Sequence, residues 1–187
     1  LEEESPKVLS AADRRRLEQS RLKLNYFLGN ILLEMVEKRH ANKRQFLDEA
    51  KESLKRIEQA MSPNAYVAKF AGRVALAEGR TTEAAQLLEQ ADKGFRGRDP
   101  QTALLLISLY SATAPEKAEK ILDRFLRKAQ FARNPALLQA KARLKMQQRQ
   151  YDEASQLIRR ILQINPNDTE ARALKVELEL LAGPKKE

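Results

Sequence analysis

The chain of 187 residues has no cysteine, no tryptophan and a single histidine, and it contains six glycines and seven prolines. Without cysteine, a disulfide, a thiolate metal site and a cysteine nucleophile are all excluded. No apolar run approaches the roughly 20 residues that a membrane-spanning helix needs. His40 stands alone, so a zinc site is not expected, and we place it at the surface end of a helix, where a cation is favourable. We therefore expect no catalytic residues, no metal site and no cofactor.

The residues that are abundant favour helix. Leu, Ala, Glu, Gln, Lys and Arg dominate, and these are strong helix formers, whereas Val and Thr are sparse. The one glycine-rich stretch, residues 94–98, lacks the spacing of a phosphate-binding loop and a preceding strand, so we interpret it as an ordinary loop. Composition thus predicts an all-α chain.

The charge balance is strongly basic, with 35 Lys and Arg against 26 Asp and Glu, a net charge of +9. Such a charge allows attraction to acidic proteins, to anionic membranes or to nucleic acid, and Arg14-Arg15-Arg16 is the densest basic run. Acidic residues are interspersed along nearly every predicted helix, however. We therefore favour a well-solvated helical surface over nucleic-acid binding, which stays as an alternative.

Four alanines recur at a nearly constant spacing. Ala50, Ala84, Ala118 and Ala154 are 34, 34 and 36 residues apart, and each stands early in a segment with helical apolar spacing. Small residues at this period allow helices to cross closely. A helix pair does not bury its apolar face alone, so such pairs stack into an array.

The 34-residue period and its small residues resemble the tetratricopeptide repeat family. Residues 135–168 resemble one full repeat, with Ala142 in its first helix, Ala154 in its second and Pro166 closing it. Residues 65–98 resemble another, with Gly72 at the small position of the first helix, Gly79 at the turn, and Ala84 and Ala91 at the small positions of the second helix. The resemblance spans most of residues 22–182. It implies an all-α fold, a right-handed α-solenoid of about four antiparallel helix pairs and a terminal capping helix.

Apolar spacing and stop signals predict the helices in more detail. Ser10 and Asp13 form an N-cap arrangement for a long first helix. Its apolar stripe comprises Leu24, Phe27, Leu28, Ile31, Leu32 and Met35. The expected ranges are 11–39, 43–61, 64–78, 81–93, 100–112, 115–130, 134–148, 151–164 and 168–182.

These helices make one predicted repeat domain over residues 11–182. Its pairs lie near 11–61, 64–98, 99–130 and 134–166. In its capping helix, over 168–182, Leu181 and three other apolar residues are expected on the face opposite the charged residues. Residues 1–10 and 183–187 are expected to be flexible, and Gly183-Pro184 to stop the last helix.

Two places depart from the family pattern. Gly29 has the surroundings of the small position in a first helix, but it lies nine residues further from Ala50 than the family spacing. Either the first helix carries about two and a half extra turns or the likeness is accidental. In the third pair only residues 111–114 separate the helices, and the glycine turn is absent.

The resemblance also implies a binding surface, because the first helix of each pair lines a concave groove in this family. Tyrosine offers contact area, and arginine grips carboxylates with paired hydrogen bonds, so such a groove suits an acidic peptide. The alternative is that Tyr66 and Tyr110 merely pack between pairs. The candidate lining is Lys23, Tyr26, Asn30, Tyr66, Lys69, Arg73, Tyr110, Gln139 and Arg143.

We therefore expect a non-catalytic scaffold or adaptor that binds a partner protein or peptide, in a bacterial secretion, envelope or pilus-type assembly. Self-association through the long first helix is a variant of this hypothesis. The alternatives are a basic module for nucleic acid and a recruitment domain of a larger enzyme. The absence of a leader and of an apolar span leads us to expect a soluble cytoplasmic or periplasmic piece of a longer protein.

Overall fold

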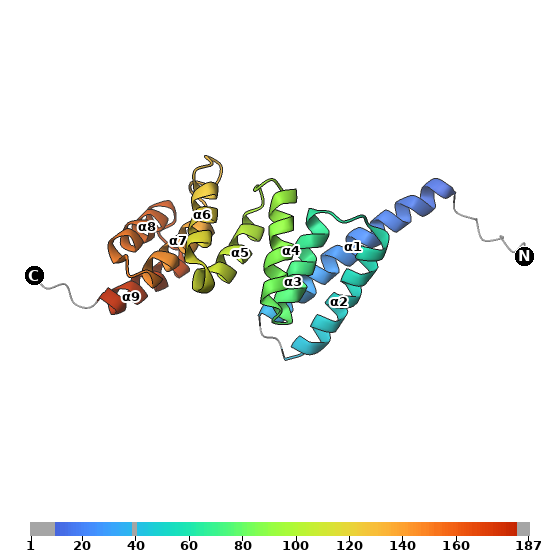
Figure 1. Cartoon of the computed structure of the whole chain (residues 1–187), viewed down its shortest axis with the longest axis horizontal. Coiled ribbons are helices and arrows are strands. Elements are labelled where there is room, and N and C mark those ends of the chain that lie inside the picture. Colours follow the sequence, from blue (N-terminus) through green and yellow to red (C-terminus); the bar gives the residue numbers. More distant parts are fainter. Residues whose placement is uncertain (1–9, 39–40, 183–187) are drawn as a thin grey trace, which may run out of the picture. The chain divides into compact units, whose positions relative to one another are not determined.

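A computed structural model describes residues 10–38 and 41–182, and within these ranges the chain forms nine helices and no strand. The predicted all-α class is confirmed, and the predicted helix ends agree within two residues everywhere except in α6. His40, the segment before Ser10 and the stop at Gly183-Pro184 lie outside the described residues. The helices in Figure 1 are α1 (Ala11–Glu37), α2 (Lys43–Ala60), α3 (Ala65–Ala77), α4 (Thr81–Gly94), α5 (Pro100–Thr113), α6 (Pro115–Leu126), α7 (Pro135–Gln147), α8 (Tyr151–Ile164) and α9 (Thr169–Ala182).

Short polar side chains begin several of these helices by accepting hydrogen bonds from otherwise unpaired backbone N–H groups. The hydroxyl of Ser10 accepts from the N–H of Asp13 at 3.1 Å, which confirms the predicted cap of α1. Asp99 and Asn134 do the same for α5 and α7. Each of these two helices, like α6, has proline at its start, where the missing N–H costs nothing.

The prediction that α6 runs to residue 130 is wrong, because the helix ends at Leu126. The Lys128 N–H then donates to the carbonyl of Phe125, and the chain turns back. Phe131 lies against the buried Phe125 with ring centroids 5.3 Å apart. Residues 127–130 contain no helix breaker, so the turn depends on this tertiary contact and has no local signal.

The chain divides into two compact units, residues 1–91 (unit 1) and 92–187 (unit 2), each described here by itself. The boundary falls inside α4, and the expectation of one repeat domain over residues 11–182 stays a prediction. In unit 1, α1 packs along α2 and also contacts α3. Its core includes Leu33, Ile57 and Phe70, none of which has exposed surface.

In unit 2, α5 packs on α6, α7 on α8, and α9 on both α7 and α8. One buried cluster forms around Leu122, Phe125 and Leu137, and a second contains Ile158 and Leu174. Consecutive helices therefore pack as antiparallel pairs with a final single helix, as the repeat pattern predicted.

The small residues of the repeat pattern occupy the close crossings. The four evenly spaced alanines and Ala142 have no exposed surface. A Cβ on Gly72 would lie 2.8 Å from Cγ of Leu88, so only glycine fits there. At the turn after α3, Gly79 has φ +80°, and Pro166 lies exposed after α8.

Gly29 also lies at a close helix crossing, so its likeness to the small position of a first helix is not accidental. It is buried in α1, and a Cβ there would lie 2.2 Å from Cζ of Phe70. The glycine therefore takes the small position of a first helix. The nine additional residues between Gly29 and Ala50 are shared among the end of α1, the loop and the start of α2, so α1 does not carry two and a half extra turns at this point.

The predicted apolar stripe of α1 is wrong as a buried face at four of its six positions. Leu24, Phe27, Leu28 and Ile31 are 67%, 62%, 45% and 55% exposed. Leu32 of the stripe is buried, together with Gly29, Leu33 and Val36. Similarly, Leu181 was expected on the buried face of α9 but is half exposed.

None of the described helices combines the length and the apolar character that crossing a bilayer requires.

Candidate functional site

Three of the predicted lining residues, Lys23, Tyr26 and Tyr66, share one groove of about 660 Å³ in unit 1. The groove lies between α1, the end of α2 and the start of α3, and we call it the α1–α3 groove. Its surface is mainly apolar. The remaining lining residues are Gln19, Leu22, Phe27, Ile57, Met61 and Val67.

Aromatic rings connect this groove to the core of unit 1. The ring of Tyr26 meets those of Tyr66, Phe27 and Phe70 edge-on, at centroid distances of 6.0, 6.1 and 5.9 Å. Phe70 is buried, whereas Tyr66 is 59% exposed. Edge-to-face contacts fix ring orientation, so the groove presents a rigid aromatic surface.

The predicted polar lining of unit 1 includes residues that form contacts between helices. Arg73 Nη1 donates to Asn30 Oδ1 at 2.6 Å, and Nη2 donates to Glu37 Oε1 at 2.9 Å. The Arg73 side chain is only 11% exposed, and Lys69 is buried. Asn30 and Arg73 therefore join α1 to α3, and the assignment of these residues and Lys69 to a binding groove stays a prediction.

The predicted lining residues of unit 2 are distributed in a similar way. Gln139 donates to Asp168 at 3.0 Å, and Arg143 forms ion pairs with Glu170 and Glu177. These contacts join α7 to the segment that begins α9 and to α9 itself. Tyr110 packs on the α5–α6 core, and the Lys117 ammonium lies 5.0 Å from the centre of its ring.

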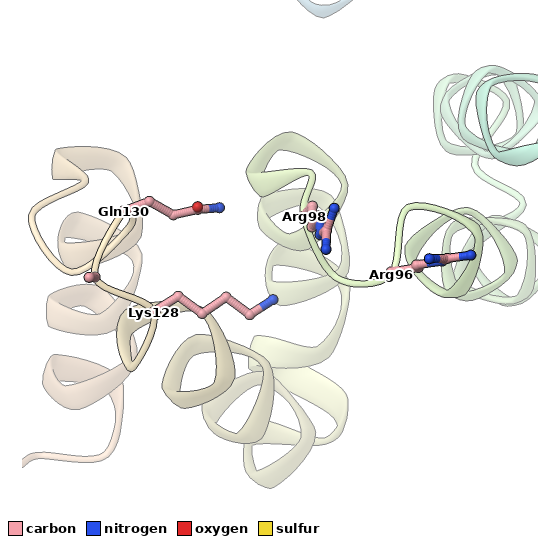
Figure 2. A pocket seen from close by; sticks show the side chains of 5 residues that line it. Arg96, Arg98, Lys128 and Gln130 are labelled. Atoms are coloured by element: carbon pink, nitrogen blue, oxygen red, sulfur yellow. The ribbon is translucent and has the colours of Figure 1, made fainter.

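Unit 2 also contains a pocket that was not predicted from the sequence. Arg96, Arg98, Lys128, Ala129 and Gln130 line a space of about 500 Å³, which we call the basic pocket. Lys128 and Gln130 point toward Arg98, as Figure 2 shows. The Lys128 ammonium donates to the carbonyl of Gly97 and so joins the segment after α6 to the loop after α4. Sequence reasoning interpreted residues 94–98 as a loop, and no local pattern pairs that loop with residues 127–130.

The shifted pKa values in the two units have structural causes away from these surfaces. A hydrogen bond to Glu119 raises the pKa of Lys145, assisted by Glu153. Hydrogen bonds from Lys51 and Arg80 lower the pKa of Glu78. Both groups belong to ion clusters between helices. Among the described residues, no three His, Cys, Asp or Glu side chains are grouped so that they could hold a metal ion.

Comparison with known proteins agrees with the repeat pattern. Residues 109–178, from the end of α5 into α9, match the Tetratricopeptide repeat family. The searches of curated proteins and of solved structures found no match. Such repeats generally mediate protein–protein interaction, and their fold is typically a non-catalytic scaffold. Its helix pairs, its buried small residues and this match over residues 109–178 support a tetratricopeptide-repeat architecture for the chain.

Proposed function

We propose that the chain is a non-catalytic scaffold that binds a segment of another protein in the α1–α3 groove. The observation that carries this proposal is the groove's exposed aromatic and apolar surface. Phe27 is 62% exposed, Tyr66 59% and Met61 37%, all beside the same 660 Å³ space. Exposed apolar surface of this kind marks binding sites, and aromatic side chains supply most of the energy in many interfaces.

The partner chemistry follows from the composition of the groove. Its floor accepts apolar side chains, and Lys23 is the one charged residue that lines it. Arg14, Arg15, Arg16 and Arg21 precede it on α1 and add positive charge. We therefore infer that the partner is a short segment with apolar anchors and flanking acidic residues. The proposed setting, a bacterial secretion, envelope or pilus-type assembly, depends on the Ala-, Gln-, Leu- and Arg-rich helices alone.

Quantitative affinity capture from the source organism tests the groove. Tyr66→Ala and Lys23→Glu change exposed side chains, so the fold should persist. We expect the amount of partner captured by the double variant to fall at least about tenfold. The matched controls are Leu180→Ala on α9 and Lys55→Glu on α2, which alter exposed residues that do not line the groove.

The controls should capture as the unchanged chain does, and circular dichroism verifies that every variant keeps its helices. Equal capture by the double variant would show that the groove is not the binding surface. Lys69 and Arg73 are unsuitable for this test, since both side chains are largely buried.

Nucleic-acid binding is a second candidate, and the basic pocket is the observation that favours it. Its lining residues include three basic side chains and no carboxylate, a composition that suits a phosphate. On this alternative the chain is retained on RNA at about 50 mM salt, and Arg96→Glu with Arg98→Glu abolishes the retention. Absence of retention removes the candidate.

A further inference from the structure

We propose that the outer face of α1 binds α1 of a second copy of this chain in antiparallel orientation. The face consists of Leu17, Leu24, Leu28 and Ile31, which we call the outer stripe. This proposal goes beyond the partner-binding groove, since it concerns a different face of α1. It also gives the expected self-association through the first helix a defined surface.

The outer stripe is the second apolar face of one helix. The inner face of α1 buries Leu33 and Val36 against the rest of unit 1. The outer stripe is between 45% and 67% exposed at every position. A helix with apolar residues on both faces belongs between two packing partners, and a contiguous exposed apolar patch marks an interface.

The spacing of the stripe specifies what kind of partner fits. Leu17, Leu24 and Ile31 are seven residues apart, which is the repeat of a coiled-coil seam. Leu28 lies on the same face, between Leu24 and Ile31. A long helix with the same repeat is the complementary surface, and α1 itself is such a helix.

The N-terminal part of α1 has little packing of its own. All residues from 11 to 21 are exposed, although Gln19 borders the α1–α3 groove, and Figure 1 shows this part extending past the ends of α2 and α3. A helical segment of about 11 residues is marginally stable in water without tertiary contacts. A second α1 lying alongside supplies those contacts.

The charges of α1 select the antiparallel orientation. Arg14, Arg15 and Arg16 lie at its start, and Glu34 lies near its end, beside Glu37, which Arg73 of the same chain already holds. A parallel pair would set the arginines of both copies side by side, whereas an antiparallel pair sets them beside glutamates. The opposed charge blocks therefore make the surface complementary to itself about a twofold axis.

The register follows from the same charges. Arg16 and Glu34 are eighteen residues apart, which is about five helical turns, so both lie on one flank of the stripe. A twofold axis near Asn25 then brings Arg16 of each copy beside Glu34 of the other. In this register the stripes interleave, because Leu24 of one copy falls between Leu24 and Leu28 of the second.

Light scattering after gel filtration tests the interface at up to about 100 μM protein, where a micromolar dimer is almost fully formed. We expect a dimer for the unchanged chain and for Leu180→Glu, which places a charge on an exposed leucine of α9. Leu24→Glu should raise the dissociation constant at least about tenfold. Because Leu24 is 67% exposed, the helix content of this variant should be unchanged.

The absence of cysteine makes the orientation measurable. In a mixture of the Leu17→Cys and Ile31→Cys chains, a short bifunctional thiol reagent should join the two different chains and not like with like. Arg16→Glu should weaken the dimer about fivefold, and adding Glu34→Arg should restore it.

Several results would overturn the proposal. One is a monomer throughout this concentration range, including a monomer that binds anionic vesicles through the stripe, which would make a lipid surface the occupant. Another is cross-linking of Leu17→Cys chains only to each other, which would show a parallel pair. The Tyr66→Ala and Lys23→Glu variant should remain dimeric, so failure of the groove and failure of the dimer are distinguishable.

Discussion

The two units use the same repeat geometry to place an ion cluster, but with the charges reversed. In unit 1, Glu78 lies between Lys51 at 2.9 Å and Arg80. In unit 2, Lys145 lies between Glu119 at 2.7 Å and Glu153 at 3.2 Å. Lys51 directly follows the evenly spaced Ala50, and Glu119 directly follows Ala118. In both units the residue after an evenly spaced alanine therefore pairs with a charged residue near the end of the next first helix, and the sign of the charges is reversed.

The two clusters respond differently to pH. The pKa of Glu78 is lowered by its cations, so its stabilisation is present above the ordinary value of 4.5 and is lost as the pH falls. The pKa of Lys145 is raised by its carboxylates, so its stabilisation is present below 10.5 and is lost as the pH rises. The hydrogen bond to Glu78 also raises the pKa of Lys51. The cluster of unit 1 is therefore sensitive to acid through Glu78 and to alkali through Lys51, whereas the cluster of unit 2 is sensitive to alkali through Lys145.

The largest expected effect separates the two cores. Phe70→Ala in unit 1 and Phe125→Ala in unit 2 each remove a fully buried ring, at a cost of about 3–5 kcal/mol. Hydrogen exchange measured by mass spectrometry should increase mainly in the unit that carries the change. A uniform increase in both units would show that they unfold together, which would limit the comparison drawn above.

Gly29→Val should have the next largest effect, about 1–3 kcal/mol of destabilisation in unit 1. The new Cβ would lie 2.2 Å from the Phe70 ring, and the buried ring has no room to move. Denaturant unfolding measures the loss. Ala60→Val near the exposed end of α2 is the control and should change stability by less than about 0.5 kcal/mol. A neutral Gly29→Val would show that α1 shifts freely on α3.

Lys145→Met should cost about 2 kcal/mol, because it removes charge-assisted hydrogen bonds from a side chain that is only 7% exposed. The unchanged chain should lose stability above about pH 10.5, and the variant should lose less over the same range. Thermal unfolding between neutral and alkaline pH measures both. Identical alkaline profiles would exclude Lys145 as the source of the sensitivity.

Glu78→Gln should have the smallest effect, at most about 1 kcal/mol, because its two cationic partners are largely exposed. The acid-induced loss of stability in unit 1 below pH 4.5 should be reduced in this variant. Exchanging the charges in Lys51→Glu with Glu78→Lys tests the comparison directly, since it gives unit 1 the charge order of unit 2. If the pair functions as described, the double exchange is less destabilising than either single change.

The sequence predicts the fold well because its signals are local. The caps at Ser10 and Asn134, the prolines that begin three helices and the apolar period define helices without reference to distant residues. The end of α6 was missed because Phe131 folds back on Phe125, a tertiary contact with no local pattern.

The candidate site was predicted only in part. Periodicity places Tyr26, Tyr66, Asn30 and Arg73 on first helices. It does not show which of these side chains are already bonded to other residues of the same chain. In the structure the tyrosines border the α1–α3 groove, whereas Arg73 is held by Asn30 and Glu37. The basic pocket was missed because Arg98 and Lys128 are thirty residues apart and meet only in the folded chain.

In the part of the chain that the structure describes, the sequence by itself determined the number of helices, their limits except at the end of α6, and the small residues at their crossings, because helix formation and close approach depend on local spacing. The tertiary structure alone decided which apolar face of α1 is buried. Both faces satisfy the helical period, and only packing against α2 and α3 distinguishes Leu33, which has no exposed surface, from Leu24, which is 67% exposed. The sign of each ion cluster can be read from the sequence, but its pairing required the distances between helices.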